Sequence, residues 1–413
     1  MSIQLACDGG TPVRKEFLTF GRPMIGEEEI AEMMDTLRSG WIGFGPKCIR
    51  FEEEFARYVN AEHAISVNSA TAALHLALLA ANVGPGDEVI TTPMTFVATA
   101  NVITHVGATP VFVDVDPVTQ NLDPNRVEAA VTGRTKAILP VHMRGWPCDM
   151  NAISAIAARH GLSIIEDAAH AAEAWYRGRK IGGISHFTAF SFYATKNLTT
   201  GEGGMLTTDD DSVVDRLRAL RLHGLDKDAW KRYAPGGAIP YQALEPGYKY
   251  NLTDMHASLG LHQLARLEQS LEVRNQLWKM YDDAFQDMPG VVVRKTPKEL
   301  GTRHARHLYT IELDLEQLDC DRLRFMAALG AENIGTGIHF VPVHLHGHYR
   351  RTYGTRRGDF PHAEHIGDRT VSLPLSASMG EQDAQDVIFA VCKVASHFYA
   401  HSSTSMVDER MAA

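Results

Sequence analysis

A single lysine, Lys196, lies in the stretch SFYATKNLTTGEGG (191–204), just after an apolar run that ends at Phe192. A lysine acts as a nucleophile only when part of its population is neutral, so its site must lower the pKa of the amine by burial or by nearby positive charge. For an isolated lysine, the alternative is a solvated loop charge paired at the surface with Glu202. Other residues must decide between these two interpretations.

A carboxylate, Asp167, follows the apolar run Ser163 to Ile165 and therefore stands where a predicted parallel strand ends. Open α/β sheets bind their ligands at that edge, although Asp167 taken alone is also a typical helix cap. Lys196 follows 29 residues downstream, beyond another strand. Together the two residues meet the needs of an aldehyde cofactor with a protonated pyridine nitrogen, namely an anion at the nitrogen and a lysine at the aldehyde carbon.

Such a cofactor also needs a site for its phosphate. Residues 68–71 (NSAT) begin a predicted helix, and a helix N-terminus offers free N–H groups and a favourable dipole to an anion. Ser191, at the end of the strand before Lys196, adds a hydroxyl group. Phe96 follows another strand end and could stack on a pyridine ring, with a place in the core as the alternative. Each of these signals is weak by itself, because helix caps of this kind are common.

The elements that would position these residues alternate between helical and strand patterns from Asn68 to about residue 205, which is typical of an α/β fold. The strands are continuously apolar, as expected in a sheet that is covered on both faces. A last strand, Gly204 to Thr208, follows closely enough to form a hairpin at one edge of the sheet. The other predicted elements are a helix over Thr71 to Ala81 and strands over Glu88 to Thr92, Pro110 to Val115, Ala137 to Val141, Ser163 to Glu166 and His186 to Phe192.

A long helical pattern over residues 253–285 is interpreted as the bridge between two domains. We expect an N-terminal arm (1–20), a large cofactor-binding α/β domain (21–265), a smaller C-terminal α+β domain (266–400) and a disordered tail (401–413). The elements expected in the small domain are strands over Val291 to Val293 and His307 to Asp314, and helices over Asp321 to Ala328 and Glu381 to Ala395.

Composition narrows the functional class. The 413 residues are 45% hydrophobic and 22% charged, which is typical of a globular chain long enough for two domains. A formal charge of -10 disfavours nucleic-acid binding. Five widely spaced cysteines without a CxxC pair indicate neither a disulfide framework nor a zinc ribbon, so a reducing cytoplasm fits best. No apolar run approaches the about 18 residues of a membrane span, and the start MSIQLACDGG lacks the pattern of an export signal.

With these residues in view, the chain resembles a known family, the sugar aminotransferases of the aspartate aminotransferase fold (fold type I pyridoxal-phosphate enzymes). This resemblance implies a three-layer α/β fold with a mostly parallel central sheet, and amino transfer to keto-sugar nucleotides or related keto-cyclitols. Seven stretches match in order over nearly the whole chain, which is more specific than any one motif. They are SGWIGFGPKCIRFEEEF (39–55), NSATAALHLAL (68–78), TTPMTFVATANVI (91–103), IEDAAHA (165–171), SFYATKNLTTGEGGM (191–205), GYKYNLTDMHASLGLHQL (247–264) and HFVPVHLHGHYR (339–350).

Carried over residue by residue, the resemblance implies that Lys196 forms the Schiff base with pyridoxal 5'-phosphate and that Asp167 pairs with the pyridinium nitrogen. His170 would lie near the cofactor ring, and Phe96 would stack on it. Some relatives that remove hydroxyl groups carry histidine at the lysine position, so lysine favours transamination, with pyridoxamine 5'-phosphate as the intermediate form. The phosphate would be held by Ser69, Ala70, Thr71 and Ser191, joined by Asn251 from the second subunit of a homodimer.

The resemblance also implies the substrates. L-glutamate would give its amino group to C4 of a nucleotide-linked 4-keto sugar in a ping-pong reaction, for an antibiotic or a cell-surface glycan. Amination at C3, or of a keto-cyclitol, is the alternative. The segment PVHMRG (140–145) departs from the family, because relatives often carry an aromatic residue where this chain has arginine. Candidate sugar contacts are Trp41, Arg144, Lys249, His339 and His344, the last two within the segment 339–348.

Three other interpretations compete with this one. His344, His346 and His348 would line one face of an extended chain, as in a metal-dependent hydrolase, but no carboxylate or cysteine accompanies them at ligand spacing, so no metal is expected. The loop Gly43 to Cys48 superficially looks like a nucleotide-binding glycine loop, but it lacks the third glycine and a preceding strand. A catalytically idle regulatory protein of the same fold would not be expected to keep the lysine, the carboxylate and the phosphate cup together.

Overall fold

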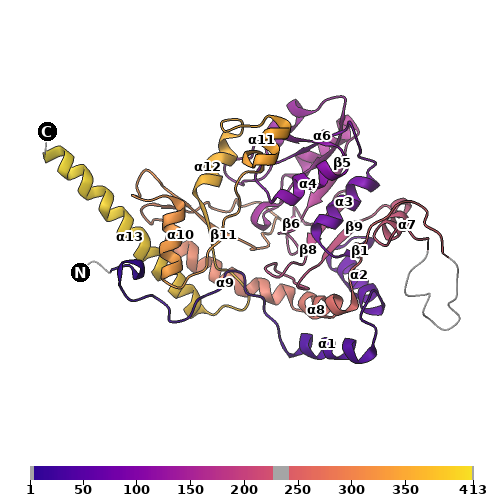
Figure 1. Ribbon diagram of the computed structural model, residues 1–413, viewed down its shortest axis with the longest axis horizontal. Helices are drawn as coiled ribbons and strands as arrows, with labels where there is room; N and C mark the ends of the chain where they lie inside the picture. Colours follow the sequence, from indigo (N-terminus) through magenta and orange to yellow (C-terminus); the bar gives the residue numbers. More distant parts are fainter. Residues whose placement is uncertain (1–3, 227–240, 412–413) are drawn as a thin grey trace.

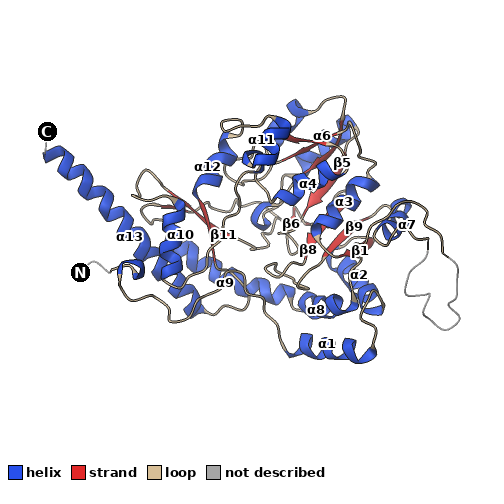
Figure 2. Cartoon of the chain, in the orientation of Figure 1, coloured by secondary structure: helices blue, strands red, loops and turns tan. Residues whose placement is uncertain are grey.

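The structure, a computed structural model, describes residues 4–226 and 241–411, with side chains as far as residue 399. Most of the chain forms three layers in which helices cover both faces of a central sheet (Figures 1 and 2). The expected fold class, α/β with a mostly parallel central sheet, is therefore confirmed.

The central sheet has seven strands, in the spatial order β1 (His63–Val67), β9 (Gly204–Thr208), β8 (Phe187–Ser191), β5 (Ser163–Asp167), β4 (Thr135–Leu139), β2 (Glu88–Thr91) and β3 (Thr109–Phe112). All pairings from β8 to β3 are parallel, and β9 is antiparallel to both of its neighbours. Strand β9 pairs with β8 as the predicted hairpin requires. The prediction that this hairpin forms an edge is wrong, because β1, a strand that the sequence analysis missed, lies outside β9.

Both faces of the sheet are apolar. The strands are continuously apolar, and successive residues of a strand point to opposite faces of the sheet. Ile138 and Ile164 belong to one core, whereas Leu139 and Ile165, the next residues along each strand, belong to the other. The first core includes α2 (Pro46–Val59), α6 (Met150–His160) and α8 (Asp254–Ala265), and the second includes α3 (Ala70–Ala80), α4 (Val97–His105) and α7 (Asp211–Leu220).

The predicted helix over residues 253–285 is two helices. Helix α8 ends at Ala265, Arg266 leaves the helical conformation with φ -106° and ψ 8°, and α9 (Leu267–Phe285) begins at the next residue. The Arg266 guanidinium reaches back to the N-terminal part of the chain, where it donates to the Met24 carbonyl at 3.0 Å and contacts Glu29. A contact distant in sequence thus accompanies the break. Helix α9 then carries the chain to a second body (Figure 1).

This second body has its own hydrophobic core, formed by α9, α10 (Arg322–Ala331), α13 (Glu381–Met411) and an antiparallel sheet of β10 (Val291–Val292), β11 (Tyr309–Leu313) and β12 (Thr370–Leu373). The sequence analysis missed β12. The N-terminal segment joins this core through Leu5, and Leu18 pairs with Ile334. Helix α13 continues to Met411, into the tail for which the sequence predicts disorder. The domain boundaries and the disorder of that tail stay predictions.

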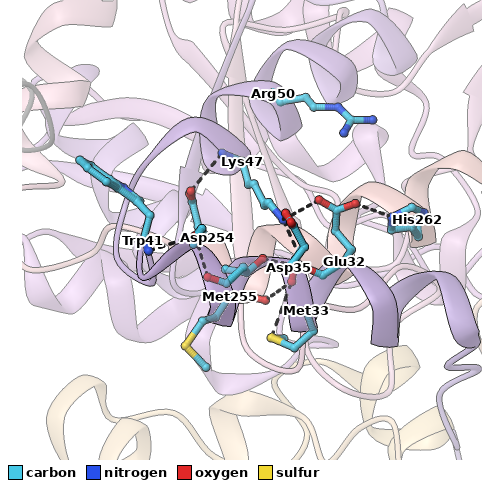
Figure 3. Close-up of polar contacts among 12 residues, drawn as sticks. Glu32, Met33, Asp35, Trp41, Lys47, Arg50, Asp254, Met255 and His262 are labelled. Carbon is cyan, nitrogen blue, oxygen red and sulfur yellow. Dashed lines mark hydrogen bonds and ion pairs between the residues drawn. The ribbon is translucent and has the colours of Figure 1, made fainter. Parts of the chain in front are cut away.

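Polar contacts fasten α1 (Glu27–Ser39) to α2 and α8 (Figure 3). Lys47 of α2 lies 2.6 Å from Glu32 of α1, which in turn lies 3.1 Å from His262 of α8. Asp254 accepts hydrogen bonds from the backbone N–H groups of Lys47 at 3.1 Å and Cys48 at 2.9 Å. The start of α2 is therefore already capped by a carboxylate, which argues against a nucleotide site in the glycine-containing loop before it.

The remaining elements are short. They are α5 (Pro124–Val127), α11 (Gly347–Tyr353) and α12 (Pro361–Arg369), the strands β6 (Trp175–Tyr176) and β7 (Arg179–Lys180), and the 3-10 turns η1 (Ala6–Asp8), η2 (Glu128–Ala130), η3 (Met143–Gly145) and η5 (Val343–Leu345). Within the described residues, no helix combines the length and the apolar character needed to cross a membrane.

Candidate active site

Lys196 lies in the loop that follows β8, close to Asp167 at the end of β5. The lysine is partly buried, and its backbone N–H donates to the Tyr193 carbonyl at 2.9 Å. Burial lowers the pKa of the Lys196 amine to about 8, while the Asp167 carboxylate opposes part of that shift. The lysine is therefore not the solvated loop charge that was the alternative, and part of its population is neutral near pH 7 to 8.

Asp167 is buried, and two groups of the protein donate hydrogen bonds to its carboxylate. Its Oδ2 accepts from the Thr99 hydroxyl at 2.8 Å, and its Oδ1 accepts from the Ala169 N–H at 3.1 Å. Burial raises the pKa of the carboxyl group, whereas these hydrogen bonds and the charge of Lys196 lower it. A buried carboxylate is costly without a cation beside it, so this site favours a positively charged group such as a protonated pyridine nitrogen.

The start of α3 offers free N–H groups. Ser69 caps the helix with its Oγ, which accepts from the Ala72 N–H at 3.1 Å. The N–H groups of Ala70 and Thr71 have no acceptor among the residues that the structure describes. They are therefore available to an anion at the positive end of the helix. Gly204 of β9 lies against this start and pairs with the end of β8. The structure thereby brings together the four residues of the predicted phosphate cup, Ser69, Ala70, Thr71 and Ser191.

Asn251 lies beside the end of β1, where it forms a short antiparallel bridge with Val67 of the same chain. Its Nδ2 donates to the Leu252 carbonyl at 2.9 Å, and its Oδ1 is buried without a partner among the described residues. Buried polar atoms are normally paired, so this amide is placed to bind something that the single chain does not supply. That Asn251 contributes to the cofactor site of a second subunit stays a prediction.

A row of aromatic rings borders the space near Lys196. The His170 ring centroid lies 4.6 Å from that of His307 and 6.0 Å from that of Phe340. The Phe340 centroid lies 6.1 Å from that of Phe96, whose side chain is 60% exposed and is free to stack on a planar ligand. Burial lowers the pKa values of His170 and His307 well below their usual range, and the charge of Lys196 adds to the effect. Both imidazoles are therefore neutral at pH 7.

Three of the five candidate sugar contacts are half-buried or exposed. His339 is influenced by Lys196: burial lowers its pKa to about 4 and the lysine charge adds to the shift, while its Nδ1 lies 2.8 Å from the Ser372 hydroxyl. Trp41 precedes α2 and donates from Nε1 to the Phe44 carbonyl at 3.1 Å. Lys249 is exposed. Their contacts with a sugar stay predictions.

The other two candidates, Arg144 and His344, are buried in contacts within the protein. Arg144 donates to the Thr310 hydroxyl of β11 at 3.1 Å, and burial lowers its pKa to about 10. His344 lies in η5, with its Nε2 3.0 Å from Glu364. The extended histidine run considered above is wrong, because η5 and α11 interrupt it. No group of three or more metal-ligating side chains is found in the described part of the chain.

Sequence reasoning missed Thr99, Asn197 and His307. Asn197 follows Lys196 directly and could have been noticed for that reason. Thr99 and His307 carry no local signal, because their partners lie 68 residues away at Asp167 and 110 residues away at Asn197. Only the folded chain shows that they belong to the site.

Known proteins with similar sequences agree with this arrangement. The profile of the DegT/DnrJ/EryC1/StrS aminotransferase family matches residues 23–392. The spore coat polysaccharide biosynthesis protein SpsC of Bacillus subtilis is 52% identical over 379 residues, which cover 92% of this chain and 97% of SpsC.

Two solved structures are similar over almost their whole length. Spr1654 from Streptococcus pneumoniae, named as a sugar aminotransferase and solved in its PLP form, has a TM-score of 0.84 at 34% identity, covering 92% of this chain and 99% of its own. DesI, solved in the presence of its TDP-sugar product, has a TM-score of 0.85 at 32% identity, covering 97% of this chain and 99% of its own. The chain therefore belongs to the DegT/DnrJ/EryC1/StrS aminotransferase family, and it is a pyridoxal-phosphate-dependent sugar aminotransferase of amino-sugar biosynthesis.

Proposed function

We propose that this enzyme transfers the amino group of L-glutamate to C4 of a nucleotide-linked 4-keto sugar, in two half-reactions that share one site and give ping-pong kinetics. The observation that carries the proposal is the placement of Lys196, with its lowered pKa, beside the buried Asp167 at the edge of the sheet. The open start of α3 supplies a place for a phosphate near the same edge.

In this proposal, each residue acts through a property seen in the structure. Lys196 would hold the cofactor at its aldehyde carbon, and its amine, part of which is neutral near pH 8, would move a proton between two carbon atoms. When bound, pyridoxal phosphate supplies the electron sink that stabilises the carbanion. Asp167 holds the ring nitrogen in its protonated form, because a buried anion favours a cation beside it. Ser69, Ala70, Thr71 and Ser191 hold the phosphate, and Phe96 and His170 border the ring.

The acceptor is argued from the relatives and from sequence segments. DesI was solved with a TDP-sugar product, which supports a nucleotide-linked sugar. SpsC is named for spore coat polysaccharide, which supports a cell-surface glycan rather than an antibiotic as the destination. The segments SGWIGFGPK (39–47) and GYKYNLTD (247–254) support amination at C4, with C3 amination or a keto-cyclitol acceptor as the alternative.

A substrate panel tests this proposal. The purified enzyme is incubated with glutamate and with thymidine- and uridine-linked 3-keto and 4-keto sugars, and the aminated carbon is located by NMR of the product. We expect amination of a 4-keto sugar, loss of turnover in Lys196→Ala with retained pyridoxamine phosphate binding, and a borohydride-fixed label on Lys196. Turnover in Lys196→Ala, or amination only of 3-keto sugars or cyclitols, would contradict the respective part of the proposal.

We also propose a homodimer in which Asn251 enters the partner's site. Helix α1 carries an apolar stripe of Ile30, Met34 and Leu37, whose side chains are 49%, 42% and 49% exposed. Apolar side chains at this spacing form one face of a helix and are typical of a surface that another protein covers. Helix α1 packs along α8, which begins three residues after Asn251 (Figure 1). The stripe therefore lies on a helix that packs against the helix following Asn251, the residue that is expected to cross between subunits.

Sedimentation velocity checks this dimer. Met34→Glu places a charge in the stripe and should shift the protein to the monomer, with weaker pyridoxal phosphate binding because Asn251 is no longer supplied in trans. The matched control is Leu323→Glu on α10, whose side chain is 64% exposed outside the stripe and should leave the dimer intact. A dimer that persists in Met34→Glu would show that this surface is not the interface.

A further inference from the structure

A chain of buried hydrogen bonds runs behind Lys196, and the roles proposed above do not use it. Arg274 of α9 contacts the Glu173 carboxylate, whose Oε2 accepts from Asn197 Nδ2 at 2.9 Å. The Oδ1 of Asn197 lies 2.9 Å from Nδ1 of His307. Arg274 and Glu173 are 2% and 0% exposed. Buried charged groups of this kind are costly unless they are fully paired, so the chain calls for an explanation.

The direction of each hydrogen bond in this chain is determined by its ends. Glu173 faces Arg274, which is always charged, so its carboxylate accepts. The Ala305 carbonyl, 2.9 Å from Asn197 Nδ2, can also only accept. The Asn197 amide must therefore point its NH2 group at these two acceptors and its oxygen at His307. His307 consequently carries its hydrogen on Nδ1, and the neutral ring has its lone pair on Nε2.

The ring that carries this lone pair lies beside His170 and close to Lys196. His307 Nε2 has no hydrogen-bond partner among the described residues, and it is not fully enclosed by protein atoms, whereas the unpaired Nδ1 of the neighbouring His170 is. The titratable groups facing His307 are His170, whose ring centroid lies 4.6 Å away, and Lys196, His339, Arg274 and His304. Burial and these groups together keep the ring neutral, as described above, so Nε2 is an acceptor and not a second cation beside the lysine.

We propose that Arg274, Glu173 and Asn197 are positioning residues that hold His307 in its Nδ1–H form, and that Nε2 of His307 accepts a hydrogen bond from a hydroxyl group of the sugar substrate. Only the second half of this proposal, the hydrogen bond with the sugar, rests on the function proposed above. A sugar ring presents several hydroxyl donors, and a neutral acceptor fits them without repelling the Lys196 amine. A protonated or Nε2–H imidazole would instead offer a donor at this position.

The neighbouring His304 provides an internal control. The Arg306 N–H donates to His304 Nδ1 at 2.9 Å, so His304 must carry its hydrogen on Nε2, the opposite form from His307. The charges that act on His304 are Arg306 and Arg144, and Lys196 is not among them. The structure thus predicts opposite tautomers for two buried histidines that are three residues apart.

The tautomers are read by 15N NMR of histidine-labelled, cofactor-free enzyme, with His307→Gln and His304→Gln used to assign the signals. We expect the Nδ1–H form at His307 and the Nε2–H form at His304. Asn197→Ala should mix the tautomers of His307 and leave His304 unchanged. An Nε2–H form at His307 would overturn the proposal. The tautomer is read in the unaltered protein, and the two glutamine variants serve only to assign its signals.

Steady-state kinetics test the contact with the sugar. His307→Phe should raise the KM for the sugar about 3- to 10-fold, the effect of one lost neutral hydrogen bond, with a smaller change in kcat and in the KM for glutamate. His307→Gln, which keeps an acceptor, should recover most of this loss, and His304→Phe should not reproduce it. Equal KM values in the unaltered enzyme and His307→Phe would overturn the sugar contact. An unaltered enzyme that aminates no sugar would refute the proposed function, while the tautomer measurement would still stand.

Discussion

Replacing Gly204 with alanine tests whether the start of α3 must lie where the structure places it. A methyl group on Gly204 would lie 2.5 Å from the carbonyl carbon of Ser69, and 2.7 Å from both the Ser69 oxygen and the Ala70 nitrogen. Ordinary van der Waals contact begins at 3.4 Å, so β9 and the start of α3 would have to move apart by about 0.9 Å. All three neighbours are backbone atoms, which cannot rotate away. Strand β9 cannot easily move either, since β1 and β8 hold it in register on both sides.

The expected cost has two parts. Overpacking of a buried site lowers the free energy of unfolding by about 1–3 kcal/mol. The movement also displaces the N–H groups of Ala70 and Thr71 from the place where a phosphate would bind. Because a charge at a helix terminus is worth about 1 kcal/mol, the Kd for pyridoxal phosphate should rise about fivefold in Gly204→Ala.

Urea unfolding of the cofactor-free protein measures the first effect, and absorbance titration with pyridoxal phosphate measures the second. The matched control is Gly43→Ala, because no atom lies within 4 Å of its added methyl group and its φ is not in the left-handed region. If Gly204→Ala unfolds at the same urea concentration as Gly43→Ala and binds the cofactor equally well, the close packing of β9 on the start of α3 is wrong.

Three further predictions concern the site and its supports. Burial lowers the pKa of Lys196 from 10.5 to about 8. The buried ammonium therefore lowers the free energy of unfolding by its full amount below pH 8, and this destabilisation disappears as the pH rises to 10.5. Lys196→Met should therefore raise the Tm of the cofactor-free enzyme more at pH 7 than at pH 10, and an equal gain at both would contradict the shift. Ser69→Ala removes the cap of α3 and should cost about 1 kcal/mol in urea unfolding, while Ser69→Asn should restore most of it. Asp254→Ala leaves the N–H groups of Lys47 and Cys48 without their acceptor and should cost about 1–2 kcal/mol, so an unchanged unfolding midpoint would show that water replaces the carboxylate.

The elements that were predicted well carry their signal locally. The helix that begins at Ala70 and the strands that end at Asp167 and Ser191 are marked by continuous apolar residues and by polar residues at their ends. Helix α2 was missed although its signal is also local, since Pro46 stands at its first turn after Gly45. The elements that could not be read depend on partners elsewhere: β1 is a strand because it pairs with β9, and β12 because it pairs with β11.

The sequence by itself determined that a carboxylate and a lysine each follow a predicted strand and that a helix start with hydroxyl groups precedes them. Parallel strands align their carboxyl ends, so the sequence favoured one edge of the sheet for these residues, and the pairing of β5 with β8 brings them together there. Only the tertiary structure decided which groups surround them. Thr99 reaches Asp167, and Asn197 joins Glu173 to His307, across 24 to 110 residues of chain. Hydrogen-bond direction and burial are properties of such contacts between distant segments, and no local pattern of residues contains them.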